Sequence, residues 1–319
     1  AFVLMTDRAH MPAASKIPNL LCYEELIEGA SDKFDWPNFD ENSASSLCYT
    51  SGTTGNPKGA LYSHRSTVLH TYAAALPDSL NCSARDVILP VVPMFHVNAW
   101  GLPYAACMVG AKLVFPGPHL DGKSLHELFE SDGVTVSAGV PTVWQGLLTH
   151  VEAHDLTFST MRRTVIGGSA CPPAMMRAFQ ERHDVQVLHA WGMTEMSPLG
   201  TVASFKAKHL GMTQEERYAV MAKQGHAIFG VDMKIIDADG NDLPWDGKNS
   251  GELLVRGQWI VSGYYKGEKS PLVDGWFPTG DIATIEPGGI MQIRDRTKDV
   301  IKTGGEWISS IDLENAAMG

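Results

Sequence analysis

The sequence lacks long apolar runs, a basic surplus and paired cysteines. Its most apolar stretch, residues 87–95, is interrupted by Pro90 and Pro93 and predicts no bilayer-spanning helix. Lysine and arginine total 25 against 36 aspartate and glutamate, a formal net charge of −11. That sign disfavours nucleic acid as the main partner, because phosphates are bound by a basic face. The five cysteines contain no Cys-x-x-Cys pair, which disfavours a structural zinc site and predicts reduced thiols in a cytoplasmic protein.

Between residues 46 and 202, short apolar segments alternate with amphipathic ones. This alternation predicts a layered α/β fold with largely parallel strands. Strands are expected at residues 46–49, 87–90, 112–115, 134–138, 163–166 and 185–189, and helices at residues 22–28, 64–75, 123–130, 141–150 and 173–182. Thr213 and Glu216 stand at capping-box spacing and predict the start of another helix.

Residues 226–294 have a different sequence pattern. Short strand-like runs are separated by turn pairs at Asp239-Gly240, Asp246-Gly247, Asp274-Gly275 and Gly288-Gly289. Such spacing is typical of antiparallel strands joined by tight turns. We therefore expect a small antiparallel, β-barrel-like subdomain here.

A glycine-rich stretch follows the strand expected at residues 46–49. It holds hydroxyl, glycine and lysine residues: Thr50, Ser51, Gly52, Thr53, Thr54, Gly55, Lys58 and Gly59. Glycines let several backbone N–H groups converge on one anion, while hydroxyls and lysine add donors and charge. The spacing does not fit a Walker loop, because Lys58 follows Pro57 rather than a glycine. The stretch suits a polyphosphate better than a plain surface turn, which needs no lysine.

This stretch resembles the phosphate loop of the adenylate-forming enzymes, which include acyl-CoA synthetases, firefly luciferase and peptide-synthetase adenylation domains. Further motifs of that family recur in order at Pro93–His96, Gly167–Ala170, Trp191–Glu195, Thr279–Asp281 and Asp295–Asp299, and the likeness covers nearly everything from residue 46 to residue 319. The resemblance implies the family's layered α/β large domain with its small β-barrel-like subdomain. It also implies that a carboxylate attacks the α-phosphate of ATP with Mg²⁺ present, and that a thiol such as that of CoA then displaces AMP.

The resemblance assigns a role to individual residues. It implies nucleotide contacts at Thr50, Ser51, Gly52, Thr53, Thr54, Gly55, Lys58, Val97, Gly168, Ser169, His189, Ala190, Trp191, Thr194, Asp281, Arg296, Lys302 and Trp307. It implies catalytic roles for Lys58, His96, Thr194 and Glu195, metal contacts at Thr50 and Glu195, and a hinge at Lys298. Purely structural roles remain alternatives for some of these residues: a turn aspartate at Asp281, a core histidine at His189, and ordinary surface residues at Lys298, Lys302 and Trp307.

The substrate is indicated by the segment around His96. Amino-acid-activating relatives place an aspartate there to pair with the substrate ammonium, so His96 disfavours an amino acid. Val97 and Trp100 continue a likeness to long-chain fatty acyl-CoA synthetases, with Gly139 also expected at the acyl chain. The resemblance thus implies a medium- or long-chain fatty acid:CoA ligase. An enzyme that loads a carrier protein, a catalytically incomplete nucleotide-binding fragment and a purely structural Trp100 remain alternatives.

The chain is expected to be a fragment, since it starts without methionine and contains no Pro-x-x-x-x-Gly-Lys-type stretch after Lys302. The expected organisation is a remnant of the N-terminal part with a connecting segment at residues 1–45, an ATP- and acyl-binding subdomain at 46–225, a β-rich subdomain at 226–295, and a hinge with the start of a truncated C-terminal domain at 296–319. Such a fragment should be weakly active or inactive. The expected partners are the fatty acid, ATP and CoA; peripheral membrane contact and homodimerisation stay open.

Overall fold

The computed structural model describes residues 1–50, 56–297, 301–303 and 306–308. The chain divides into two compact units, Ala1–Asp40 and Glu41–Gly319. The first unit contains strand β1 (Phe2–Leu4), a short 3₁₀ helix (Arg8–His10), strand β2 (Leu20–Cys22), which pairs in parallel with β1, and helix α1 (Tyr23–Ile27). The remaining elements belong to the second unit, which carries the site.

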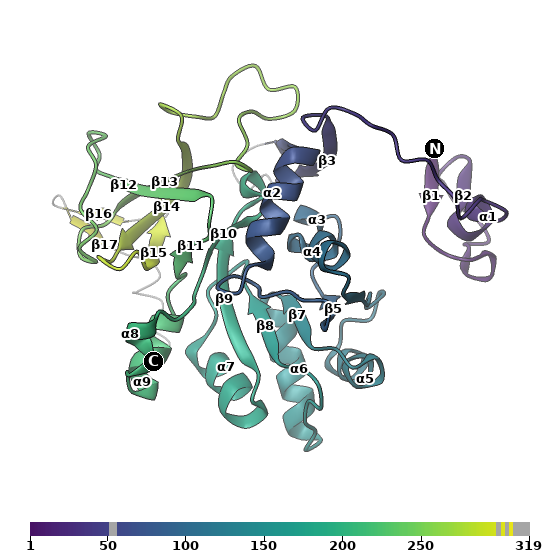
Figure 1. The fold of residues 1–319 in the computed structure, drawn as a ribbon, viewed down its shortest axis with the longest axis horizontal. Coiled ribbons are helices and arrows are strands. Elements are labelled where there is room, and N and C mark those ends of the chain that lie inside the picture. The colour runs from purple at the N-terminus through teal and green to yellow at the C-terminus, as the bar shows by residue number, and fades with distance from the viewer. Residues whose placement is uncertain (51–55, 298–300, 304–305, 309–319) are drawn as a thin grey trace. The chain divides into compact units, whose positions relative to one another are not determined.

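A seven-stranded sheet in the order β11-β10-β9-β8-β7-β5-β6 forms the centre of the second unit (Figure 1). Its parallel strands are β5 (Val87–Pro90), β6 (Lys112–Leu113), β7 (Val136–Gly139), β8 (Arg163–Ile166) and β9 (Gln186–Gly192). Two antiparallel strands, β10 (Leu199–Val202) and β11 (His226–Ala227), extend the sheet beyond β9. The expected parallel α/β layer is confirmed, and β10 and β11 are additions that the sequence did not predict.

Helices cover both faces of this sheet. They are α2 (His64–Ala75), α3 (Val97–Trp100), α4 (Leu102–Val109), α5 (Gly122–Asp132), α6 (Pro141–Ala153) and α7 (Pro173–Arg177), which runs on into a π-helical turn (Ala178–Arg182). Successive strand side chains point to opposite faces. Val165 and Leu188 therefore share a core with α2 and α4, whereas Ile166 and Val187 share a second core with α5, α6 and α7. The result is a sheet buried on both faces, as parallel sheets usually are.

The strand expected at residues 46–49 forms, but it does not join the parallel sheet. It is β3 (Ala44–Tyr49), which pairs antiparallel with β4 (Gly59–Ser63) in a separate two-stranded sheet. Because Tyr49 pairs with Gly59, the glycine-rich stretch is the connection of a hairpin. Ser63 ends β4 and caps α2 through a reciprocal hydrogen-bonded pair with Ser66. The hairpin and α2 thus fix the two described ends of this connection, where the Thr50 N–H donates to the Lys58 carbonyl at 2.9 Å.

The β-rich region is a four-stranded antiparallel sheet, β12 (Val231–Ile236), β13 (Gly251–Gly257), β14 (Phe277–Ile285) and β15 (Met291–Arg296). Among the described strands this sheet is open, so the expected antiparallel unit is present without the closure of a barrel. His226 and Ala227 pair with β10 in the large sheet rather than with this one. The two sheets share one core, which includes Met233 and Phe277. The domain boundaries drawn from the sequence stay predictions.

The remaining elements are short. They are a 3₁₀ turn (Thr194–Met196), helices α8 (Ala207–Leu210) and α9 (Gln214–Met221), and the paired strands β16 (Ile301–Thr303) and β17 (Glu306–Ile308). The predicted start of α9 is confirmed, because Thr213 and Glu216 form a capping box. Within the part of the chain that the structure describes, no helix has the length and apolar character needed to cross a membrane.

Candidate active site

A cavity of about 810 Å³ opens at the carboxyl ends of β7, β8 and β9. In α/β folds ligands bind outside the carboxyl ends of parallel strands, where loops bring side chains together. Residues predicted from the sequence line this cavity: Thr50, Lys58, His96, Val97, Trp100, Gly168, Ala190, Trp191, Thr194, Glu195 and Arg296. Segments up to about 250 residues apart in the sequence therefore meet at one place.

Of the predicted residues between Thr50 and Arg296 that the structure describes, four do not line the cavity. His189 lies in the core, where its Nε2 accepts from the Cys171 N–H at 3.4 Å and its Nδ1 donates to the Met221 carbonyl at 3.2 Å. Burial lowers the pKa of His189, so its ring is neutral. With both ring nitrogens bound to backbone groups, it fits the alternative of a core histidine. The sequence predicts Gly139 at the acyl chain, but its backbone faces Trp144, since a Cβ there would lie 2.9 Å from Trp144 Cζ2.

Ser169 and Asp281 are the other two. Ser169 is exposed, whereas Asp281 is buried directly behind cavity residues. Other predicted positions, Ser51, Gly52, Thr53, Thr54, Gly55 and Lys298, lie outside the described residues. Lys302 and Trp307 are paired across β16 and β17.

Asp281 is held from two sides. The Trp191 indole Nε1 donates to its Oδ2 at 3.1 Å, and Arg296 Nε lies 3.0 Å from its Oδ1 as an ion pair. Asp281 and Arg296 are opposite each other in β14 and β15, which explains their proximity. Burial raises the pKa of Asp281 to about 6, against the opposing effects of Arg296 and Trp191. Oδ1 accepts no hydrogen bond from the described residues but is ion-paired with Arg296, so a hydroxyl-bearing ligand that reached it would share this oxygen with Arg296.

Glu195 lies in the 3₁₀ turn that follows β9. Its side chain is buried, and its Oε1 accepts a 2.7 Å hydrogen bond from the Tyr264 hydroxyl. Burial and this bond raise the pKa of Tyr264, so the hydroxyl stays protonated and donates. The Lys58 ammonium lies 5.0 Å from the centroid of the Tyr264 ring. Tyr264 also lines the cavity, yet nothing in the sequence distinguished it from the neighbouring Tyr265.

The segment that carries Val97 and Trp100 has an unusual backbone. Val97, Asn98, Ala99 and Trp100 all have positive φ, from 44° to 57°, and Gly101 follows at 77°. Left-handed geometry costs a non-glycine residue about 1–2 kcal/mol. Asn98 Oδ1 accepts a 2.8 Å hydrogen bond from the Ser46 hydroxyl, which offsets part of that cost. This left-handed turn, which the sequence did not predict, brings Val97 and Trp100 to the cavity.

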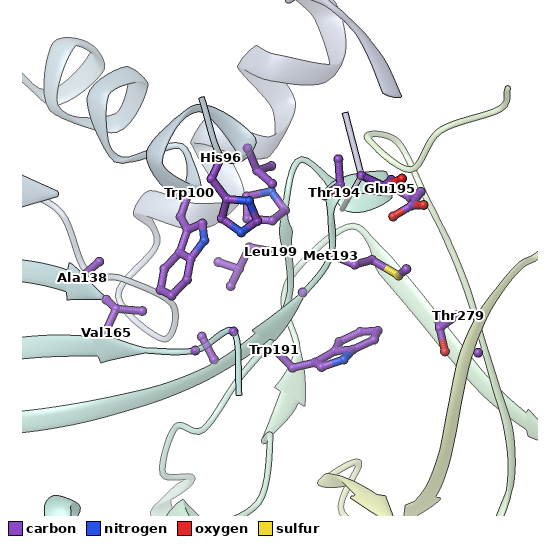
Figure 2. Close-up of a pocket in the computed structure, with 18 of the residues that line it drawn as sticks. His96, Trp100, Ala138, Val165, Trp191, Met193, Thr194, Glu195, Leu199 and Thr279 are labelled. Atoms are coloured by element: carbon purple, nitrogen blue, oxygen red, sulfur yellow. The ribbon is translucent and has the colours of Figure 1, made fainter. Parts of the chain in front are cut away.

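Trp100 lies against the backbone of the Gly167–Ala170 motif. A Cβ on Gly167 would come within 3.3 Å of Trp100 Cη2, so glycine permits this close approach. In Figure 2 the Trp100 ring points toward Ala138 and Val165, while Thr194 and Glu195 lie across the cavity. The cavity therefore has an apolar end, which includes Leu80 and Val165, and a polar end around Glu195.

Leu199, between these two ends, is fixed by residues that the sequence did not single out. The Leu199 N–H donates to His70 Nε2 at 3.1 Å, and the Leu199 carbonyl accepts from Trp259 Nε1 at 3.2 Å. Burial lowers the pKa of His70 to about 3, so its ring is neutral and accepts. A Cβ on Gly101 would lie 2.7 Å from His70 Cε1. His70 thus packs against both the left-handed turn and the Leu199 segment.

The polar end fits a magnesium ion bound with a nucleotide. No donor among the described residues reaches Glu195 Oε2, which leaves this oxygen for a ligand. The Thr50 hydroxyl accepts from the Lys58 N–H at 3.1 Å and also lines the cavity. Mg²⁺ takes hard oxygen ligands and is often held by one or two protein groups together with substrate phosphates.

Comparison with known proteins identifies the family. The sequence pattern of the AMP-binding enzymes matches residues 6–265. The chain belongs to the AMP-binding enzyme family. It is 55% identical over 99% of its length to 3-methylmercaptopropionyl-CoA ligase of Ruegeria lacuscaerulensis, and 54% identical over its whole length to medium-chain-fatty-acid–CoA ligase of Ectopseudomonas oleovorans. It is 48% identical to long-chain-fatty-acid–CoA ligase of Thermus thermophilus over 100% of the chain.

The chain spans 58–59% of the length of these three relatives. Among solved structures it resembles O-succinylbenzoate coenzyme A synthetase from Bacillus subtilis in complex with ATP and magnesium ion. The TM-score is 0.80, with 23% identity over 100% of this chain and 64% of the other. ATP-bound MatB from Rhodopseudomonas palustris gives a TM-score of 0.78 and 25% identity over 93% of this chain and 58% of that one. The adenylate-forming fold predicted from the motifs is confirmed.

Proposed function

We propose that this chain is the ATP- and acid-binding core of a fatty acid:CoA ligase. The observation that carries the proposal is one cavity with a polar end, which holds Thr194 and Glu195, and an apolar end (Figure 2). Lys58 lines the same cavity and lies over the ring of Tyr264, the tyrosine that is hydrogen-bonded to Glu195. A nucleotide triphosphate and an apolar acid bound there would meet between the two ends. The relatives named as CoA ligases support the same reaction class.

In the proposed first step a carboxylate oxygen of the acid attacks the α-phosphorus of ATP. The bond to the bridging oxygen breaks, and pyrophosphate leaves with its electron pair. Two anions approach each other, so the site must supply positive charge and donors. Lys58 would neutralise charge on the leaving phosphates, and the Thr194 hydroxyl would donate to the α-phosphate. Mg²⁺ held by Thr50 and Glu195 would neutralise further phosphate charge.

The nucleoside would lie at the other residues of the polar end. Trp191 offers a flat indole to the adenine, and Asp281 Oδ1, which is ion-paired with Arg296, would accept from a ribose hydroxyl once Arg296 moves away. Arg296, half-exposed beside Asp281, can move toward the phosphates or the ribose. In the second step the CoA thiolate would attack the acyl carbonyl carbon and release AMP.

The acyl group would occupy the apolar end. Burial there stabilises a bound chain by roughly 0.8 kcal/mol per methylene. His96, at the mouth, is exposed and supplies no carboxylate for a substrate ammonium. We therefore propose a medium- or long-chain fatty acid as substrate. A short thioether acid is the second candidate, because a relative at 55% identity is named 3-methylmercaptopropionyl-CoA ligase.

Thermal-shift titration with non-hydrolysable acyl-adenylate analogues tests this proposal. A ligand at about 100 times its Kd adds about 2.7 kcal/mol to the apparent stability. We expect dodecanoyl- and octanoyl-adenylate analogues to stabilise the chain more than AMP does. A larger shift from the 3-methylmercaptopropionyl analogue would favour the second candidate, and no shift from any adenylate would refute the proposed function. The cytoplasmic location, membrane contact and dimerisation stay predictions.

A further inference from the structure

We propose that Tyr264 is a positioning residue for the phosphate end of the site, acting through Glu195 and Lys58 at once. Its hydroxyl would orient the Glu195 carboxylate toward a metal ion, and its ring would hold the Lys58 ammonium over the phosphates. This inference rests on the proposed function, because it assigns a role within that site. It concerns a residue that none of the sequence motifs includes.

The first observation is the geometry of the three side chains. The Tyr264 hydroxyl is 2.7 Å from Glu195 Oε1, and Lys58 Nζ is 5.0 Å from the centroid of the Tyr264 ring. All three side chains line the same cavity. They come from three separate places in the fold: the start of β4, the turn after β9 and the connection between β13 and β14. One tyrosine therefore joins a carboxylate and a cation that are 137 residues apart in the sequence.

The second observation is the backbone that carries Tyr264. The Val261 N–H donates to the Glu195 carbonyl at 2.9 Å, and the Tyr265 N–H donates to the Gly59 carbonyl at 2.8 Å. Tyr264 itself forms an antiparallel bridge with Ala60. Residues 261–265 are thus hydrogen-bonded both to the turn of Glu195 and to the strand that begins beside Lys58. The tyrosine is held at a defined position relative to both of its partners.

The hydrogen bond from the Tyr264 hydroxyl determines which oxygen of Glu195 faces a metal ion. A carboxylate can rotate and offer either oxygen, and an isolated one has no fixed direction. With Oε1 engaged by Tyr264, Oε2 is the oxygen left for a metal ion. Groups that hydrogen-bond to metal ligands in this way typically change metal affinity or activity 10- to 100-fold when they are removed.

The Tyr264 ring restricts where the Lys58 ammonium lies. A lysine side chain has many rotamers, and ordering it opposes binding. An ammonium over an aromatic face is attracted by the negative potential of the ring. Lys58 is exposed, so this contact restricts a side chain that would otherwise move freely in solvent. The ring thereby lowers the entropy cost of placing the cation at a phosphate.

The two halves of the role can be separated by substitution. Tyr264→Phe keeps the ring beside Lys58 and removes only the donor to Glu195, whereas Tyr264→Leu removes both. Tyr265→Phe is a matched control, because Tyr265 is the adjacent tyrosine and its exposed ring faces Lys266 instead. ATP affinity is measured by calorimetry on the chain, once with Mg²⁺ and once with EDTA.

We expect Tyr264→Phe to weaken ATP binding about 10-fold in Mg²⁺ and to leave binding in EDTA within twofold of the unsubstituted chain. Tyr264→Leu should weaken binding under both conditions, because it also releases Lys58. Tyr265→Phe should change neither value. If Tyr264 acts through Glu195, the double variant Tyr264→Phe/Glu195→Gln should bind Mg·ATP no more weakly than Glu195→Gln alone.

Several results would overturn the inference. An equal loss in Mg²⁺ and EDTA for Tyr264→Phe, with a lowered Tm, would mean that the tyrosine only packs. Additive losses in the double variant would mean that it does not act through Glu195. If Tyr264→Leu fails to fold, the Mg²⁺ dependence of Tyr264→Phe decides alone. If the unsubstituted chain binds ATP equally with and without Mg²⁺, the metal site of the proposed function fails as well, which separates that failure from a failure of Tyr264 only.

Discussion

The bond between Trp191 and Asp281 predicts how nucleotide binding depends on pH. Asp281 can accept hydrogen bonds from ribose hydroxyls best when it is ionised. Its pKa is raised to about 6 by burial. Affinity for adenosine, which has no titrating phosphate, should therefore rise as the pH increases through about 6 and should level off above it, because the carboxylate loses its proton in that interval.

Trp191→Phe keeps an aromatic face for the adenine and removes the indole donor from Oδ2. A hydrogen bond to a charged group contributes about 1.5–3 kcal/mol, and 1.36 kcal/mol corresponds to one pKa unit. Loss of a donor that favours the ionised form raises the pKa further. We expect the midpoint of the pH profile to move upward by about one pH unit in Trp191→Phe.

The assay is calorimetric titration of adenosine into each protein between pH 5 and pH 8, because the phosphate of AMP would itself titrate near pH 6. Asp281→Asn is the control, since an amide does not titrate and its profile should be flat in the interval around pH 6. A midpoint unchanged by Trp191→Phe would refute the claim that the indole stabilises the ionised carboxylate. A pH step that persists in Asp281→Asn would show that another group titrates.

Three further substitutions, at two positions, test the left-handed turn and the apolar end of the cavity. Asn98→Leu should destabilise the fold by about 1–3 kcal/mol, because the Ser46 hydroxyl loses its acceptor; Asn98→Gly loses the same acceptor but suits the positive φ and should cost about 1 kcal/mol less. Urea unfolding measures both, and a glycine variant less stable than the leucine variant would contradict this reading of the left-handed turn. Val165→Phe fills the apolar end and should weaken a dodecanoyl-adenylate analogue about 10-fold, the equivalent of about two methylenes, while AMP binds as before. Equal losses for both ligands in calorimetry would place the acyl chain elsewhere.

The elements best predicted from the sequence are those with strong local signals. The strand at residues 87–90, the strand at 163–166 and the helix at 64–75 have the predicted bounds. Each is a compact apolar run or an amphipathic stretch with clear limits. The motif residues at the cavity were found for another reason, since they resemble an ordered set of family motifs.

The features that the sequence missed depend on distant contacts. The left-handed turn at Val97–Trp100 contains no glycine, and its main visible support is the bond from Ser46, which lies 52 residues earlier. Tyr264 matters because it meets Lys58 and Glu195, and its neighbour Tyr265 looks identical in the sequence. His189 stood next to cavity residues in a strand, but the alternation of side chains puts it in the core. Strands β10 and β11 are short, and they are stabilised by the sheet that they extend.

The most direct test of the account is a crystal structure of the chain with a non-hydrolysable dodecanoyl-adenylate analogue. The account predicts the adenine against Trp191, a ribose hydroxyl on Asp281 and the acyl chain past Trp100 toward Val165 and Leu80. An adenylate bound outside this cavity, or an acyl chain that leaves past His96 into solvent, would contradict it.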